Sequence, residues 1–380
     1  MILSVAAIVS AIALLAVLVA RRGAAAIADR SPVAARLRTV YTLVAALLAL
    51  RLIAPLATAT PLVIALMLVA AWLPMAALRL VEELRRRHAP PLVKMVALGG
   101  AVGFSALAVT LGIVWSAAAA LALALYQLTM LALMVALLAR SRGELGRGER
   151  RTADTFLLAL LLTIPLAATD FAAVLPDMPI RGGAFAALLL VLATARLAAG
   201  DGSPWRLVAD LLVAAGAGGV SVIIALAAQP TLPGDAVILV AAGGTALACL
   251  LLIVARSKAG DDDATGLVAA LARAPAHDPH ALIAAHPLLA SGRVLGPAEL
   301  RAYPEASIAR LLDHPVVSTS SDDSEARDAA REVLDAYAAT HLVRLSRTPP
   351  QLLAVAAGSL TAPALDDELV LVARLIERSA

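Results

Sequence analysis

"VILVAAGGTALACLLLIVARSKAGDDDATG", residues 237–266, contains the change of character on which the fold of this chain depends. Its first part is almost entirely apolar, and a helix needs about 20 such residues to cross about 30 Å of hydrocarbon. Its second part is charged and contains glycine, as connecting segments do. We therefore predict a transmembrane helical domain over 1–255, a linker over 256–265 and a separate small domain over 266–380.

The composition of the whole chain supports an integral membrane protein. Of its 380 residues, 61% are hydrophobic and 16% are charged, whereas an average soluble domain is about 25% charged. The single cysteine, Cys249, lies inside an apolar run, so a disulfide within the chain is excluded.

Outward from 237–266, further apolar stretches of membrane-spanning length occur along the first two thirds of the chain. Seven to nine spans fit, because the seventh stretch is short and 93–139 divides only around Trp115. The nine predicted spans are 2–20, 39–57, 61–81, 93–113, 117–139, 154–174, 182–199, 206–227 and 236–255.

The charges of the connecting segments predict the orientation. Lys and Arg concentrate on the cytoplasmic side of bacterial inner-membrane proteins. The connections after the odd-numbered spans carry most of these residues, whereas those near 58–60, 114–116, 175–183 and 228–235 carry only Arg181. We expect the N-terminus outside and the C-terminal domain in the cytoplasm.

Charged residues inside the spans are candidate sites, because burying a charge in a membrane is costly. Arg51 falls about two-thirds of the way outward along the second span, and Asp170 falls near the outer end of the sixth. Arg196 and Asp210 fall near the inner ends of the seventh and eighth spans. Each pair is expected to neutralise itself between packed helices or to extend to the interface. The alternative is a ligand or ion site lined by Arg51 and Asp170.

Tyr126 and Gln127 form a polar group half-way along the fifth span. Hydrogen bonds between helices explain such a group, and a ligand contact is the alternative. Clusters of small residues at 99–103, 214–219 and 241–244 are expected to let helix backbones pack closely.

The C-terminal part is typical of a water-soluble α+β domain. Short strands are expected at "GRVL" (292–295) and "HPVVSTS" (314–320), and a hairpin at 341–346 and 351–357 around Pro349 and Pro350. Helices are expected over 265–274, after an Asp278 N-cap, over 321–340 and in the closing segment.

This order resembles the C-terminal half of a GAF domain. The resemblance rests on "THLVRLSRTPPQLLAVAAGSLTAPALDDELVLVARLIERSA", 340–380, and on "AELRAYPEASIARLLDHPVV", 298–317. It implies an antiparallel sheet with flanking helices. The whole layout resembles the front half of bacterial sensor histidine kinases of the PrsK type, without a phospho-acceptor helix or ATP lid in these 380 residues.

We therefore expect a non-enzymatic membrane sensor whose GAF-like domain acts on another protein, such as a separate kinase. The alternative is a transporter-like or accessory subunit of a membrane complex with a docking tail. No catalytic residue, cofactor, metal or nucleic-acid partner is expected, and His277, His280 and His286 are interpreted as surface histidines. The expected partners are the lipid bilayer, another protein and, in an oligomer, further copies of the chain.

Overall fold

The computed structural model describes most of the chain, and every statement below concerns the described residues. These are 5–26, 28, 31–54, 60–85, 87–110, 117–143, 147–171, 181–198, 203–264, 267, 271, 278–318, 321, 323–337, 339–357 and 362–379. The predicted interfacial residue Trp115 and most of the predicted helix over 265–274 lie outside them.

The chain divides into two compact units. The first, named here the helical unit, comprises Met1–Gly143, Ala153–Arg196 and Ser203–Arg256. The second, named the C-terminal unit, comprises Glu144–Thr152, Leu197–Gly202 and Ser257–Ala380. Each unit is described by itself.

In the part of the chain that is described, nine helices, α1 to α9, lie within residues 5–264. Eight of them are long and apolar enough to cross a membrane, and the exception is α7. This is a polytopic membrane domain. The helices are α1 (Val5–Ala26), α2 (Pro32–Ile53), α3 (Thr60–Arg85), α4 (Pro91–Val109), α5 (Ala117–Ser141), α6 (Arg147–Asp170), α7 (Gly183–Ala198), α8 (Pro204–Ala228) and α9 (Gly234–Ala264).

Several helices extend beyond the predicted apolar spans. Helix α2 begins at Pro32 rather than near residue 39, and the side chain of Ser31 accepts a hydrogen bond from Ala34 N at 3.3 Å. The arginines that lengthen it are good helix formers, although they end the apolar run. Helix α9 continues to Ala264, so the expected linker over 256–265 is helical for most of its length.

Helix α7 differs from its neighbours because it is surrounded by protein. Its 16 residues rise about 24 Å at about 1.5 Å per residue, which is less than the hydrocarbon thickness. Val191, Leu192 and Ala193 are completely buried. Because other helices surround α7, it does not need the full length of a helix that crosses the hydrocarbon in contact with lipid.

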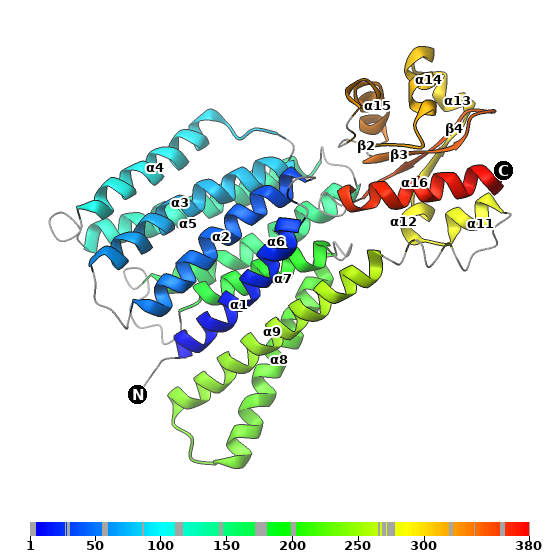
Figure 1. Ribbon diagram of the computed structural model, residues 1–380. Helices are drawn as coiled ribbons and strands as arrows, with labels where there is room; N and C mark the ends of the chain where they lie inside the picture. Colours follow the sequence, from blue (N-terminus) through cyan, green and yellow to red (C-terminus); the bar gives the residue numbers. More distant parts are fainter. Residues whose placement is uncertain are drawn as a thin grey trace. The chain divides into compact units, whose positions relative to one another are not determined.

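Glycines allow close approach of helices, as the small-residue clusters predict. A Cβ at Gly218 of α8 would lie 2.7 Å from the carbonyl oxygen of Ala241 in α9. A Cβ at Gly244 of α9 would lie 2.9 Å from the Cβ of Ser221. Helices α8 and α9 lie side by side in Figure 1, and these glycines form their contact.

The C-terminal unit is built on a four-stranded antiparallel sheet in the order β1-β4-β3-β2. In the central hairpin, Leu342 lies opposite Ala354 and Val343 opposite Leu353. The strands are β1 (Arg293–Leu295), β2 (Val316–Ser318), β3 (His341–Ser346) and β4 (Gln351–Val355). The hairpin and the two short strands agree with the sequence prediction.

Helices cover both faces of this sheet (Figure 1). Leu342, Leu352 and Ala354 pack with residues of α13 (Pro297–Leu300), α14 (Glu305–Asp313) and α15 (Ser324–Ala336). Val343, Leu353 and Val355 pack with residues of α11 (Pro279–Ala284), α12 (Pro287–Ala290) and α16 (Ala362–Ser379). This alternation is the period of two that a strand imposes.

Capping residues fix the helix starts. Asp278 caps α11, with Pro279 as its first residue, as predicted. Asp323 caps α15 by accepting hydrogen bonds from Glu325 N and Ala326 N at 2.9 and 3.2 Å. These hydrogen bonds, first of all the one from Ala326 N, lower the pKa of the Asp323 carboxyl.

Candidate functional site

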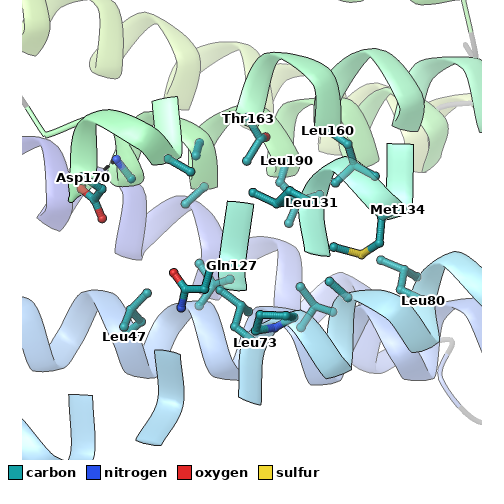
Figure 2. Close-up of a pocket in the computed structure, with 18 of the residues that line it drawn as sticks. Leu47, Leu73, Leu80, Gln127, Leu131, Met134, Leu160, Thr163, Asp170 and Leu190 are labelled. Carbon is teal, nitrogen blue, oxygen red and sulfur yellow. Dashed lines mark hydrogen bonds between the residues drawn. The ribbon is translucent and has the colours of Figure 1, made fainter. Parts of the chain in front are cut away.

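A cavity of about 170 Å³ lies inside the helical unit. Residues of α2, α3, α5, α6 and α7 line it, and nearly all of them are apolar. In Figure 2, Asp170 lies at one end of the lining residues, and Leu80 and Met134 lie toward the other. The cavity therefore has a charged end and a long hydrocarbon wall.

An ion pair forms the charged end of the cavity. A guanidinium N–H of Arg51 in α2 donates to Oδ2 of Asp170 in α6, and both residues line the cavity. The side chain of Arg51 is 29% exposed and that of Asp170 is 10% exposed. Arg51 and Asp170, predicted from the sequence to lie at similar depth, thus meet in the structure.

The first residue of α7, Gly183, also contributes to the charged end of the cavity. Gly183 N donates to Oδ1 of Asp170 at 3.1 Å, so both carboxylate oxygens accept hydrogen bonds. A Cβ at position 183 would lie 2.5 Å from Oδ2 of Asp170 and 2.9 Å from Nη1 of Arg51. Only glycine leaves room for the pair here. The positive end of the α7 dipole also favours the carboxylate.

Arg181 and Gly182, which directly precede Gly183, join the end of α6 to the start of α7. Gly182 N donates to the hydroxyl of Thr169 at 2.9 Å, and a guanidinium N–H of Arg181 donates to the carbonyl oxygen of Thr169 at 3.1 Å. These bonds hold the end of α6 against the start of α7. Asp170 is thereby fixed in position.

The polar pair on α5 forms hydrogen bonds to neighbouring helices, as predicted. Nε2 of Gln127 donates to the carbonyl oxygen of Ala70 in α3 at 2.6 Å. The hydroxyl of Tyr126 donates to the carbonyl oxygen of Ala97 in α4 at 2.8 Å. Gln127 also lines the cavity, half-way along its wall.

The second predicted pair lies away from the cavity lining and involves a third residue. Nε of Arg196 in α7 donates to Oδ2 of Asp210 in α8, and Nη2 of Arg256 in α9 lies 3.5 Å from Oδ1. The side chains of Arg196 and Asp210 are 3% and 6% exposed. Because the two charges neutralise each other between packed helices, this cluster is a structural link among α7, α8 and α9.

A buried polar chain joins the sheet of the C-terminal unit to its last helix. Oγ1 of Thr340 lies 2.8 Å from Nδ1 of His341 and accepts from Ala357 N at 2.8 Å. Nε2 of His341 lies 3.1 Å from Oδ1 of Asp366 in α16. His341 is completely buried. The Thr340–His341–Asp366 arrangement resembles a hydrolase triad only in residue types, since its Thr and His are inaccessible to a substrate.

Of the histidines interpreted as surface residues, His280 is exposed, whereas His286 is half-buried and its Nδ1 accepts a hydrogen bond from Leu288 N at 3.2 Å. His277 lies outside the described residues. Within the described part of the chain, no group of three His, Cys, Asp or Glu side chains could hold a metal ion.

Sequence reasoning missed Gly183 at the charged end of the cavity and also Thr194, which is not among the cavity-lining residues. Gly183 was not singled out, although "RGG" at 181–183 directly before an apolar helix could have indicated a close approach. Thr194 of α7 was also missed, and its hydroxyl bonds to that of Tyr41 in α2. Both signals depend on knowing which helices are neighbours.

Fold and site together define a polytopic membrane protein with an internal apolar cavity and a C-terminal α+β unit. Comparisons with protein-family models, with curated proteins and with solved structures found nothing that matches this chain.

Proposed function

We propose that this protein is a non-enzymatic membrane sensor. In this proposal the helical unit holds a membrane-soluble ligand in its cavity, and the C-terminal unit transmits the bound state to another protein by direct contact. The observation that carries the proposal is the cavity itself, an apolar space of about 170 Å³ that ends at the Arg51–Asp170 ion pair. Ligand sites are concave, mostly apolar, and contain a few placed polar groups.

The orientation of the protein in the membrane is also part of this proposal. The basic connections support an N-terminus outside and a C-terminal unit in the cytoplasm of a bacterial inner membrane. There the unit meets soluble partners such as a kinase. A four-stranded antiparallel sheet with helices on both faces supports its assignment as a GAF-like relay domain.

The test is recovery of partners from native membranes. Full-length protein carrying Leu131→Trp, which fills the cavity, is compared with the wild type and with Leu92→Trp. Leu131 lines the cavity, whereas Leu92 on α4 is 73% exposed. We expect a regulatory protein to be recovered with the wild type and with Leu92→Trp, and its amount to change at least about threefold with Leu131→Trp, a shift of at least about 0.7 kcal/mol.

Two outcomes would contradict the proposal. One is equal recovery of the regulatory protein with all three chains, since the cavity would then be irrelevant to partner binding. The other is stoichiometric recovery of integral membrane subunits without a regulatory protein. That result would favour an accessory subunit of a membrane complex.

A further inference from the structure

We propose that the cavity ligand is a single-chain amphiphile with an anionic carboxylate head group, that is, a free fatty acid. The inference rests on the proposed sensor function and specifies its ligand. The head group binds Arg51, and the acyl chain lies along the wall formed by α2, α3, α5, α6 and α7.

The negative charge of the head group is inferred from the hydrogen bonds at the ion pair. Asp170 accepts from Arg51 and from Gly183 N, and its side chain is only 10% exposed. A guanidinium has five N–H donors, more than a single carboxylate can engage, and that of Arg51 is the more exposed partner. The cation therefore has capacity for another partner, so the head group that fits is an anion.

The chain length follows from the lining residues. On α2 the lining runs from Val40 to Arg51, and on α3 it runs from Leu73 to Leu84. At about 1.5 Å per residue, each segment spans about 16 Å. That is the length of one extended long acyl chain.

The polar wall residues do not oppose an acyl chain. The Thr163 hydroxyl donates to the carbonyl oxygen of Ala159 in its own helix at 2.8 Å, and the Gln127 amide donates to Ala70. Because these donors bond to main-chain carbonyl oxygens, the wall between the two ends of the cavity is mainly aliphatic. Because the acyl chain leaves an equally apolar bilayer, the wall accommodates it and the head group provides the selectivity.

The test uses purified full-length protein in phosphatidylcholine nanodiscs and a photoactivatable palmitate. We expect cross-links to map to lining residues of α2, α3, α5, α6 or α7. Unlabelled palmitate should compete about tenfold better than hexadecanol, because only the acid forms a charge-assisted hydrogen bond with Arg51. Phosphatidylglycerol added to the nanodiscs should compete weakly.

Two kinds of variant test the contributions of the head group and of the acyl chain to binding separately. The double variant Arg51→Gln/Asp170→Asn keeps the shapes without the charges and should abolish the preference for palmitate over hexadecanol. Leu131→Trp should reduce labelling at least about tenfold, the scale of a lost acyl segment, while Leu92→Trp should label as the wild type does. The competition in wild-type protein remains decisive if a variant fails to fold.

Equal competition by palmitate and hexadecanol, cross-links confined to the outer lipid-facing surface, or stronger competition by phosphatidylglycerol would each overturn the fatty-acid assignment. If Leu131→Trp nevertheless changes partner recovery, the sensor function stands with a different ligand. If palmitate labels the cavity but partner recovery never changes, the ligand stands and the sensor function fails.

Discussion

Arg51 and Asp170 are 119 residues apart in sequence, yet they form an ion pair at the end of an apolar cavity. The pair joins α2 to α6, and the hydrogen bond from Gly183 N joins α7 to the same carboxylate. Three helices therefore meet at this ion pair. The stability of the helical unit should depend on both of its members.

Removing one charge of this pair should destabilise the protein more than removing both. Breaking a fully buried pair costs about 3–5 kcal/mol, and we expect about 1–3 kcal/mol for Asp170→Asn because Arg51 is partly exposed. Arg51→Gln/Asp170→Asn should recover part of this loss. Thermal unfolding in detergent can be followed by alkylation of Cys249, the chain's single cysteine, which is buried. A double variant less stable than both single variants would contradict this interpretation.

The Arg196–Asp210 pair should be more sensitive, because both side chains are almost fully buried. Asp210→Asn removes the carboxylate that pairs with the buried guanidinium of Arg196, and a loss of about 3–5 kcal/mol is expected. The matched control is Asp235→Asn at the exposed start of α9, expected within about 1 kcal/mol of the wild type. The same alkylation assay compares them, and equal losses would exclude a special role for Asp210.

Two adjacent glycines of α8 provide a sharp test of the α8–α9 contact. A Cβ at Gly218 would lie 2.7 Å from the carbonyl oxygen of Ala241, whereas a Cβ at Gly219 would have no atom of another element within 4 Å. Gly218→Ala should therefore lower the melting temperature. Gly219→Ala should leave it unchanged or raise it, since alanine favours a helix by about 1 kcal/mol. The reverse order would show that the two helices do not pack through Gly218.

The C-terminal unit should fold without the helical unit. Its sheet has its own buried cluster on each face, which is the requirement for an independent domain. A fragment of residues 259–380 should be soluble, melt cooperatively and give a circular dichroism spectrum of mixed helix and strand. An insoluble or purely helical product would contradict an independent α+β unit.

In that fragment, stability should fall at acid pH partly through Asp323. Hydrogen bonds from Ala326 N and Glu325 N lower its pKa below the ordinary value of 3.8. A lowered folded-state pKa means that its contribution is complete above the unfolded pKa and is lost as pH falls through the folded value. Asp323→Asn keeps the cap but cannot titrate. Melting temperatures between pH 6 and pH 2 should therefore fall less steeply for this variant, and parallel curves would contradict the assignment.

How far the fold follows from the sequence differs between the two units. In the helical unit, the apolar runs predicted the helices because a chain in hydrocarbon must satisfy its own backbone hydrogen bonds. Helix ends were less predictable, since Arg36 and Arg38 interrupt the hydropathy of α2 but not its helix. In the C-terminal unit, the turn at Pro349 and Pro350 revealed the hairpin. The short helices α13 and α14 were not predicted, because four to nine residues give little periodicity.

The sequence by itself determined the membrane class, the helices and the presence of a second unit with an antiparallel sheet, because hydropathy and turn residues act locally. It also indicated four charged residues that had to find partners. Only the tertiary structure decided that Arg51 meets Asp170 beside Gly183, that Arg256 joins Arg196 and Asp210, and that five helices leave an apolar cavity. These are properties of helix faces brought together by packing. In a nearly uniform run of Ala, Leu and Val, the sequence alone does not specify which face meets which.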